Sequence, residues 1–184
     1  MSNRLLDREH SFLLIIDIQE KFLPVLDDIE HVIQNAGILI QAALQLDIPI
    51  VVSEQFPRGL GSTVETLRNL LPQHVKTFEK TSFSCLGDLR LTNYIKSLKR
   101  QQAIIAGIET HICVNQTTHH LLECGFEPHI IADAVTSRTQ QNHDAGLRKM
   151  ESSRAIISST EIALFELLRG SSHPMFKDIQ KLVK

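Results

Sequence analysis

The sequence predicts an α/β fold, a parallel sheet with helices on both of its faces. Short apolar runs rich in branched residues recur along the chain, and segments with helical spacing separate most of them. Strands that alternate with helices form parallel sheets, whose right-handed connections place helices on both faces. The length of 184 residues suits one domain with a full core. We therefore expect a single domain over residues 1–184.

Six runs are expected to be strands. Five of them are short and almost continuously apolar, as in strands buried on both faces. They are Phe12–Ile16, Ile48–Val52, Ala103–Ala106, Ile130–Ala132 and Ala155–Ile157. The more polar run Lys76–Phe78 is a weaker sixth candidate.

Besides the helix that would carry Cys113, four segments are expected to be helices. Apolar residues recur at helical spacing in Ile29–Leu46 and in Asp88–Leu98. The polar region 143–150 predicts a more exposed helix. Thr160–Leu168 is amphipathic, with Thr160 as its expected N-cap and Gly170 beyond its end.

Composition argues against several classes of function. A net charge of −2 gives no electrostatic reason to expect nucleic acid or an anionic membrane as a partner. The longest apolar stretch, Phe12–Ile16, is too short to span a bilayer, and the N-terminus lacks the apolar core of a signal peptide. Three cysteines cannot form a fully paired framework, so we expect a reducing compartment, the cytoplasm.

Cys113 is the candidate nucleophile. It follows a predicted strand and Gly107, and Thr110 is well placed to cap a helix that would begin just before it. In the first turn of a helix, unpaired N–H groups and the helix dipole favour the thiolate and could receive an oxyanion. The alternative is an inert thiol, because free cysteine is often buried.

Polar residues follow the other predicted strands at the carboxyl edge of the sheet, where such folds bind ligands. They include Asp17, Glu54, Lys80 and Asp133. A carboxylate could take the thiol proton of Cys113, and a lysine could hold both anions in place. These residue types alone are weak evidence, since polar groups occur at the strand ends of any α/β protein.

Several residues have a structural interpretation beside a functional one. Asp17 could cap a helix that begins near Gln19, Lys80 could be a solvated loop residue, and Asp133 could pair with Arg138 in a loop. Five residues could line a substrate pocket, although core packing explains the two phenylalanines and an exposed loop position explains the histidine equally well. They are Phe22, Glu54, Gln55, Phe83 and His111.

Three motifs make the chain similar to the isochorismatase-like cysteine hydrolases, over essentially its whole length. They are residues 15–22 (IIDIQEKF), 80–84 (KTSFS) and 107–114 (GIETHICV). Within that superfamily the chain most resembles the isochorismatase domain-containing proteins, through residues 54–64, 132–138 and 173–182. The resemblance implies a six-stranded parallel sheet flanked by helices.

The same resemblance implies roles for individual residues. Cys113 matches the family's nucleophile, Asp17 its general acid and base, and Lys80 the third member of its triad. A cis peptide is implied before Glu109, whose N–H would join that of Cys113 in binding an oxyanion. Nicotinamidases of the superfamily bind a metal through an Asp-x-His pair where this chain has residues 55–57 (QFP), so we expect neither metal nor cofactor.

The implied activity is metal-independent hydrolysis of an amide-type C–N bond in a small molecule, through a covalent acyl-enzyme. True isochorismatases lack the nucleophilic cysteine, so Cys113 argues against their reaction. Homo-oligomers are common in the superfamily, and the apolar segment Met175–Val183 could dock on a neighbour. Two alternatives stay open. One is a catalytically idle binding or assembly module, and the other is a redox-responsive cysteine protein.

Overall fold

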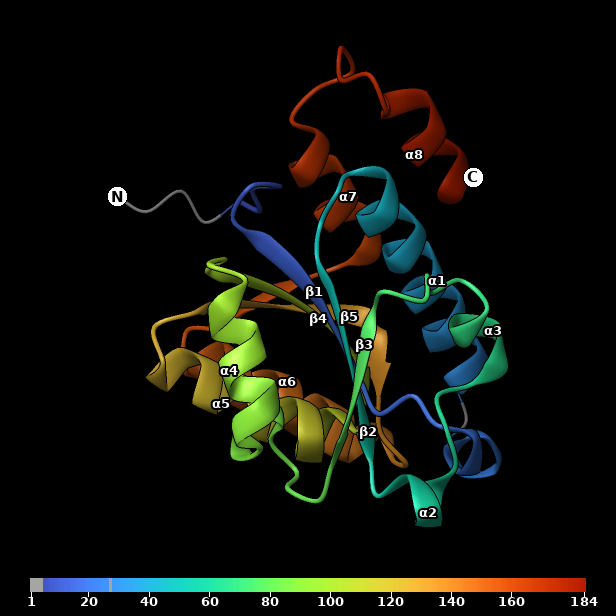
Figure 1. The fold of residues 1–184 in the computed structure, drawn as a ribbon, viewed down its shortest axis with the longest axis vertical. Helices are drawn as coiled ribbons and strands as arrows, with labels where there is room; N and C mark the ends of the chain where they lie inside the picture. Colours follow the sequence, from blue (N-terminus) through green and yellow to red (C-terminus); the bar gives the residue numbers. More distant parts are fainter. Residues whose placement is uncertain (1–4, 27) are drawn as a thin grey trace.

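A six-stranded parallel sheet forms the centre of the molecule, with strand order β3-β2-β1-β4-β5-β6 (Figure 1). The computed structural model describes residues 5–26 and 28–184. The strands are β1 Ser11–Ile16, β2 Ile50–Gln55, β3 Lys76–Lys80, β4 Gln102–Ile108, β5 Glu127–Thr136 and β6 Ile156–Ser158. Each overlaps one predicted run, and the predicted fold class is confirmed.

Helices cover both faces of the sheet (Figure 1). One face carries α1 Ile29–Gln45, α3 Glu65–Arg68, α7 Thr160–Leu168 and α8 Phe176–Leu182. The other carries α4 Leu89–Ser97, α5 Asn115–Glu123 and α6 Gln140–Ser152. Shorter helical segments lie in the connections: Glu20–Val25, α2 Pro57–Leu60, Cys85–Gly87 and the π-helical turn Thr110–Val114. Within the described ranges, no helix has the length and apolarity needed to cross a membrane.

Strand β1 shows why the central strands read as continuous apolar runs. Leu13 and Ile15 pack with the helices of one face, and Leu14 and Ile16 with those of the other. Successive side chains of a strand point to opposite faces, so a strand covered on both faces is apolar at every position. Burying each such side chain stabilises the fold by roughly 1.5–3 kcal/mol.

The helix caps predicted at Thr160 and Asp17 are wrong. Ser159, and not Thr160, caps α7, because its hydroxyl accepts the N–H of Ile162 at 3.3 Å. Thr160 instead donates its N–H and its hydroxyl to Asp133 Oδ1. Asp17 caps no helix, since the 3-10 helix that follows it begins at Glu20 and has no side-chain cap.

Candidate active site

The catalytic candidates meet at the carboxyl edge of the sheet, where the strand order changes direction. Strand β1 lies between β2 and β4, so the crevice at this edge lies where the direction of winding reverses. Asp17 follows β1, Ser53 lies near the end of β2, and Lys80 is the last residue of β3. Cys113 follows β4 in the turn Thr110–Val114. The topology thus brings the three predicted catalytic residues to one edge.

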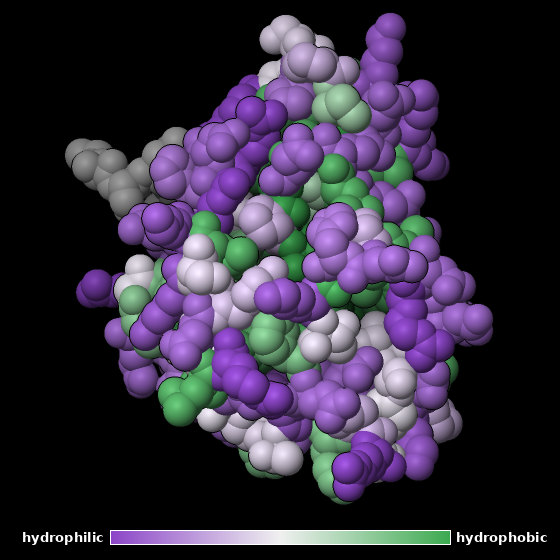
Figure 2. Space-filling view, in the orientation of Figure 1, coloured by the Kyte–Doolittle hydropathy of each residue, from purple (hydrophilic) through white to green (hydrophobic). Residues whose placement is uncertain are grey.

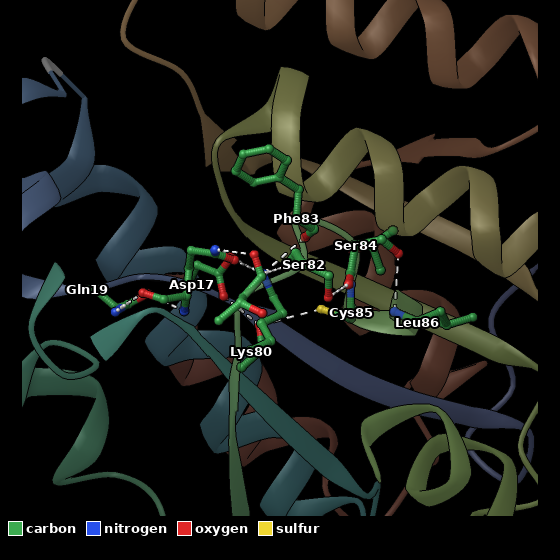
Figure 3. Close-up of polar contacts among 12 residues, drawn as sticks. Asp17, Gln19, Lys80, Ser82, Phe83, Ser84, Cys85 and Leu86 are labelled. Carbon is green, nitrogen blue, oxygen red and sulfur yellow. Dashed lines mark hydrogen bonds and ion pairs between the residues drawn. The ribbon is translucent and has the colours of Figure 1, made fainter. Parts of the chain in front are cut away.

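Lys80 and Asp17 form a fully buried ion pair. Lys80 Nζ donates to Asp17 Oδ2 at 2.7 Å, and the two side chains are 0% and 1% exposed. The ammonium also contacts Gln55 Oε1 at 2.8 Å and the carbonyl oxygens of Ser82 and Phe83 at 3.2 and 3.0 Å (Figure 3). Three N–H groups therefore face four acceptors, which makes Lys80 a fixed positive charge and not a solvated loop residue.

Ser53 holds the other oxygen of Asp17. Its hydroxyl donates to Asp17 Oδ1 at 2.7 Å, and Cys85 Sγ lies 3.5 Å from Ser53 Oγ. Cys85 is fully buried and its N–H donates to Thr117 Oγ1. Both oxygens of the carboxylate are thus fixed from the side of β2 and β3. Ser53 follows the predicted strand Ile48–Val52, but nothing in the sequence indicates its contact with Asp17.

Cys113 completes the cluster from the side of β4. It is 6% exposed, and it lies close enough to Asp17 for the carboxylate to shift the pKa of the thiol. The peptide between Ile108 and Glu109 is cis, as the resemblance implied. Thr110 does not cap a helix, contrary to prediction. It is buried inside the turn, and its hydroxyl lies 3.0 Å from His143 Nδ1.

The surroundings of Cys113 favour the neutral thiol, in contrast to the thiolate expected from its position in the chain. Burial raises the pKa of Cys113, the charge of Asp17 raises it further, and Lys80 only partly opposes them. The first turn of a helix was expected to lower the pKa of Cys113. Burial and the nearby carboxylate of Asp17 have the larger effect and raise it.

The pKa values of the two buried partners are both shifted upward. Burial raises the pKa of Asp17, and Lys80 reduces that rise by favouring the carboxylate. Burial lowers the pKa of Lys80, but the attraction of Asp17 and of the two neighbouring cysteines together outweighs it. Asp17 is thus suited to accept and return a proton, while Lys80 keeps its positive charge.

Two predicted pocket residues make contacts within the protein. Gln55 accepts from Lys80 and donates from Nε2 to the carbonyl of Thr81 at 2.9 Å. Glu54 is 8% exposed, and its Oε1 accepts both the N–H and the hydroxyl of Thr63 at 2.6 and 2.7 Å. Gln55 thus positions Lys80, and Glu54 holds the loop after α2.

The remaining pocket candidates are spread around the site. Phe83 is 52% exposed, and its ring points away from the polar cluster in Figure 3. Phe22 is partly buried and packs against the core on the α1 face. His111 is also partly buried, with Nδ1 2.9 Å from the hydroxyl of Ser137, so it is not an exposed loop residue.

The predicted loop pair of Asp133 and Arg138 is wrong. Arg138 bonds instead to Glu109, whose Oε1 accepts its Nε at 2.9 Å and its backbone N–H at 3.1 Å. Asp133 is occupied by Thr160, as described above. Both residues are structural, as expected, but they act in separate contacts. Over the described ranges, no three His, Cys, Asp or Glu side chains gather as a metal site would require.

Fold and site together define a parallel α/β protein that carries a buried cysteine, carboxylate and ammonium at the carboxyl edge of its sheet. A family model described as the isochorismatase domain matches residues 11–162. Isochorismatase domain-containing protein 2 of Danio rerio is 40% identical over 179 residues, which cover 97% of this chain and 89% of that protein. The chain belongs to the isochorismatase family.

Solved structures agree with the fold. The structure of a protein named MAR1 ribonuclease from Caenorhabditis elegans is 39% identical, with a TM-score of 0.93 over 97% of this chain and 92% of the other. An Escherichia coli protein described as an octameric hydrolase of unknown specificity shares the fold at 19% identity. Its TM-score is 0.88 over 97% of this chain and 94% of that one.

Proposed function

We propose that this protein is a metal-independent cysteine hydrolase that cleaves an amide-type C–N bond in a small molecule. The observation that supports this most directly is the buried cluster in which Asp17 contacts Lys80 at 2.7 Å and the thiol of Cys113. A nucleophile, a proton carrier and a fixed positive charge are the groups that acyl transfer requires.

In the proposed reaction, Cys113 Sγ attacks the substrate's carbonyl carbon while its proton moves to Asp17. The N–H groups of Glu109 and Cys113 receive the oxyanion. Asp17 then protonates the departing nitrogen, and the C–N bond breaks to leave a thioester on Cys113. Water attacks the thioester as Asp17 takes its proton, the C–S bond breaks, and Asp17 returns the proton to the sulfur. The acid is released and the Cys113 thiol is restored. Lys80 stays charged throughout and orients Asp17.

A neutral resting thiol is compatible with this sequence of steps. Asp17 lies close enough to shift the pKa of the thiol and can take its proton directly, so the thiolate needs to form only as the new bond forms. A lysine in contact with the carboxylate keeps it ionised and ready to accept that proton.

The proposal is tested with a panel of small amides and three proteins: the wild type, Cys113→Ala and Asp17→Asn. We expect hydrolysis by the wild type only, with losses of at least about 10³-fold in either variant, since a triad acts as a unit. Intact-mass measurements should show an acyl adduct on the wild type. Hydrolysis that survives in Cys113→Ala would remove Cys113 as nucleophile.

RNA should be tested as a substrate together with the small amides, because one relative of known structure is named a ribonuclease. The chain's net charge of −2 offers no attraction to a polyanion, and a thiol nucleophile suits acyl transfer. We expect no RNA cleavage that depends on Cys113. Cleavage that Cys113→Ala abolishes would redirect the assignment to nucleic acid.

The second candidate is a catalytically idle member that binds or assembles. It is favoured by two features of Cys113, its 6% exposure and its raised pKa. This candidate is favoured if no amide acylates the wild type and if any partner that the wild type binds is also bound by Cys113→Ala. Uptake of an acyl group by Cys113 from any substrate rules it out.

We also propose a homo-oligomer located in the cytoplasm. All three cysteines are free, as in a reducing compartment. The face in Figure 2 is mainly hydrophilic, yet Ile162 and Phe165 on α7 remain 52% and 36% exposed. The expected docking segment near the C-terminus packs against the chain's own core, through Met175 and Phe176 among others. Light scattering after size exclusion decides the oligomeric state.

A further inference from the structure

Helix α6 touches the backbone of the turn that carries Cys113, and Gly146 lies at the point of contact. A Cβ atom added at Gly146 would lie 3.1 Å from His111 Cα and 3.2 Å from both His111 N and Thr110 C. Side-chain carbons rarely approach other atoms this closely. All three atoms belong to the backbone, so no side-chain rotation could relieve the contact.

The same stretch of the turn is held by side chains of α6 and of the loop before it. His143 lies near the start of α6, and its Nδ1 is 3.0 Å from the Thr110 hydroxyl. Ser137 bonds to His111, and Arg138 bonds to Glu109. Residues 109–111 are therefore fixed from one direction, and Gly146 sets how close the helix comes.

We propose that Gly146 is a positioning residue, which places Cys113 against Asp17 by letting α6 contact the turn without an intervening side chain. This inference rests on the proposed role of Cys113 as the nucleophile. Cys113 lies two residues after His111, so a displacement of the turn reaches its sulfur atom. Burial and the charge of Asp17 both act on this thiol, so its position relative to the carboxylate affects its reactivity.

Burial raises the pKa of the Cys113 thiol, and the charge of Asp17 raises it further, which gives the effect of a displacement a measurable sign. Moving the thiol away from the carboxylate, or toward solvent, lowers its pKa. At about pH 8.5, near the pKa of a free thiol, a larger thiolate fraction makes alkylation faster. Hydrolysis, in contrast, falls when nucleophile and proton carrier lose their alignment.

The experiment compares the wild type with Gly146→Ala and with a matched control, Gly37→Ala. Gly37 also lies inside a helix, so both changes add one methyl group and raise helix propensity. Its added Cβ would meet the side chains of Leu70 and Leu67, at 3.3 and 3.7 Å, which can move. The difference between the two variants therefore isolates the backbone contact.

The probe is iodoacetamide, with peptide mass spectrometry to follow the three cysteines separately. The alkylation rate of exposed Cys124 is the reference for the reactivity of the reagent. Alkylation of fully buried Cys85 would show that the fold opens. In Gly146→Ala we expect alkylation of Cys113 relative to Cys124 to rise about tenfold, one unit of thiol pKa, with Cys85 unchanged. In Gly37→Ala all three rates should stay at wild-type values.

Two results would overturn the inference: a Cys113 rate in Gly146→Ala within about twofold of the wild type, or a parallel rise at Cys85, which would mean general loosening. With an amide that the wild type hydrolyses, kcat should fall about tenfold in Gly146→Ala. If the wild type hydrolyses no amide, the proposed function fails, while the alkylation comparison still decides the role of Gly146.

Discussion

The interior of the sheet and its carboxyl edge are both buried, but they are built on opposite principles. In β1, Leu14 and Ile15 contribute to stability independently, and a similar apolar side chain could replace either with a modest loss. At the edge, Asp17, Lys80 and Ser53 stabilise one another, because each satisfies a group that would otherwise be buried without a partner. The core tolerates single changes, whereas the polar cluster has to be complete.

The largest effect on stability is expected when one charged member of the polar cluster is removed. Lys80→Met keeps the bulk of the side chain but leaves the Asp17 carboxylate buried without its counter-ion. We expect unfolding at neutral pH to become easier by about 3–5 kcal/mol, measured by urea denaturation. Turnover should be lost at the same time, since the carboxylate would take up a proton.

A double variant sharpens the comparison. Asp17→Asn combined with Lys80→Met removes both charges, and asparagine tolerates the left-handed backbone of residue 17, whose φ is 55°. We expect the pair of changes to restore much of the stability lost in Lys80→Met without restoring turnover. A single variant as stable as the wild type would show that the cluster is not interdependent.

A smaller effect is expected from Cys85, the buried thiol beside Ser53. Burial is the main reason that its pKa is raised from 9.0 to about 11. The folded state therefore keeps the proton at a pH where the unfolded chain has lost it. The stabilisation is present in full below about pH 8.5 and is lost as the pH rises toward 11, by roughly 2–3 kcal/mol.

Urea denaturation between about pH 8 and 11 measures this loss. Cys85→Ala lowers stability at neutral pH but should flatten the decline on the alkaline side. Exposed Cys124→Ala is the matched control, in which the wild-type slope should persist. An unchanged slope in Cys85→Ala would mean that other groups cause the alkaline loss. Cys113, whose pKa is also raised, is the first of these to test.

The difference between core and edge also explains how far the sequence could predict the structure. Continuous apolar runs such as Phe12–Ile16 have a local signature, and five of the six strands fall where such runs occur. The sixth, β3, overlaps the more polar run Lys76–Phe78. The meeting of Asp17, Lys80 and Cys113 followed from parallel topology together with the family's motifs. A sequence pattern does not show which charged groups the fold brings close to a side chain. The expected helical position of Cys113 therefore predicted a thiolate, and the effect of the neighbouring carboxylate on its pKa could not be foreseen.

Contacts between distant side chains were beyond sequence reasoning for the same reason. Gln19 was seen only as a possible helix start, yet its amide spans two loops, with Nε2 donating to the carbonyl oxygens of Gln55 and Gly61. Thr160 matched the preferences of an N-cap as well as Ser159 did. The fold brings Asp133 close enough to accept the hydroxyl of Thr160. The cap is therefore Ser159, one residue before the predicted position.

That one-residue correction gives the smallest predicted effect. Ser159→Ala removes the hydroxyl that accepts the N–H of Ile162, and the loss of an N-cap lowers stability by about 1 kcal/mol. Thr160→Ser keeps the hydroxyl that bonds Asp133, so its effect should come only from one lost methyl group. Thermal unfolding of the two variants separates the assignments.

If Thr160→Val leaves stability unchanged, the hydrogen bond from Thr160 to Asp133 makes no net contribution to the free energy of unfolding. Equal losses for Ser159→Ala and Ser152→Ala, a hydroxyl at the exposed end of α6, would mean that Ser159 is no cap in solution.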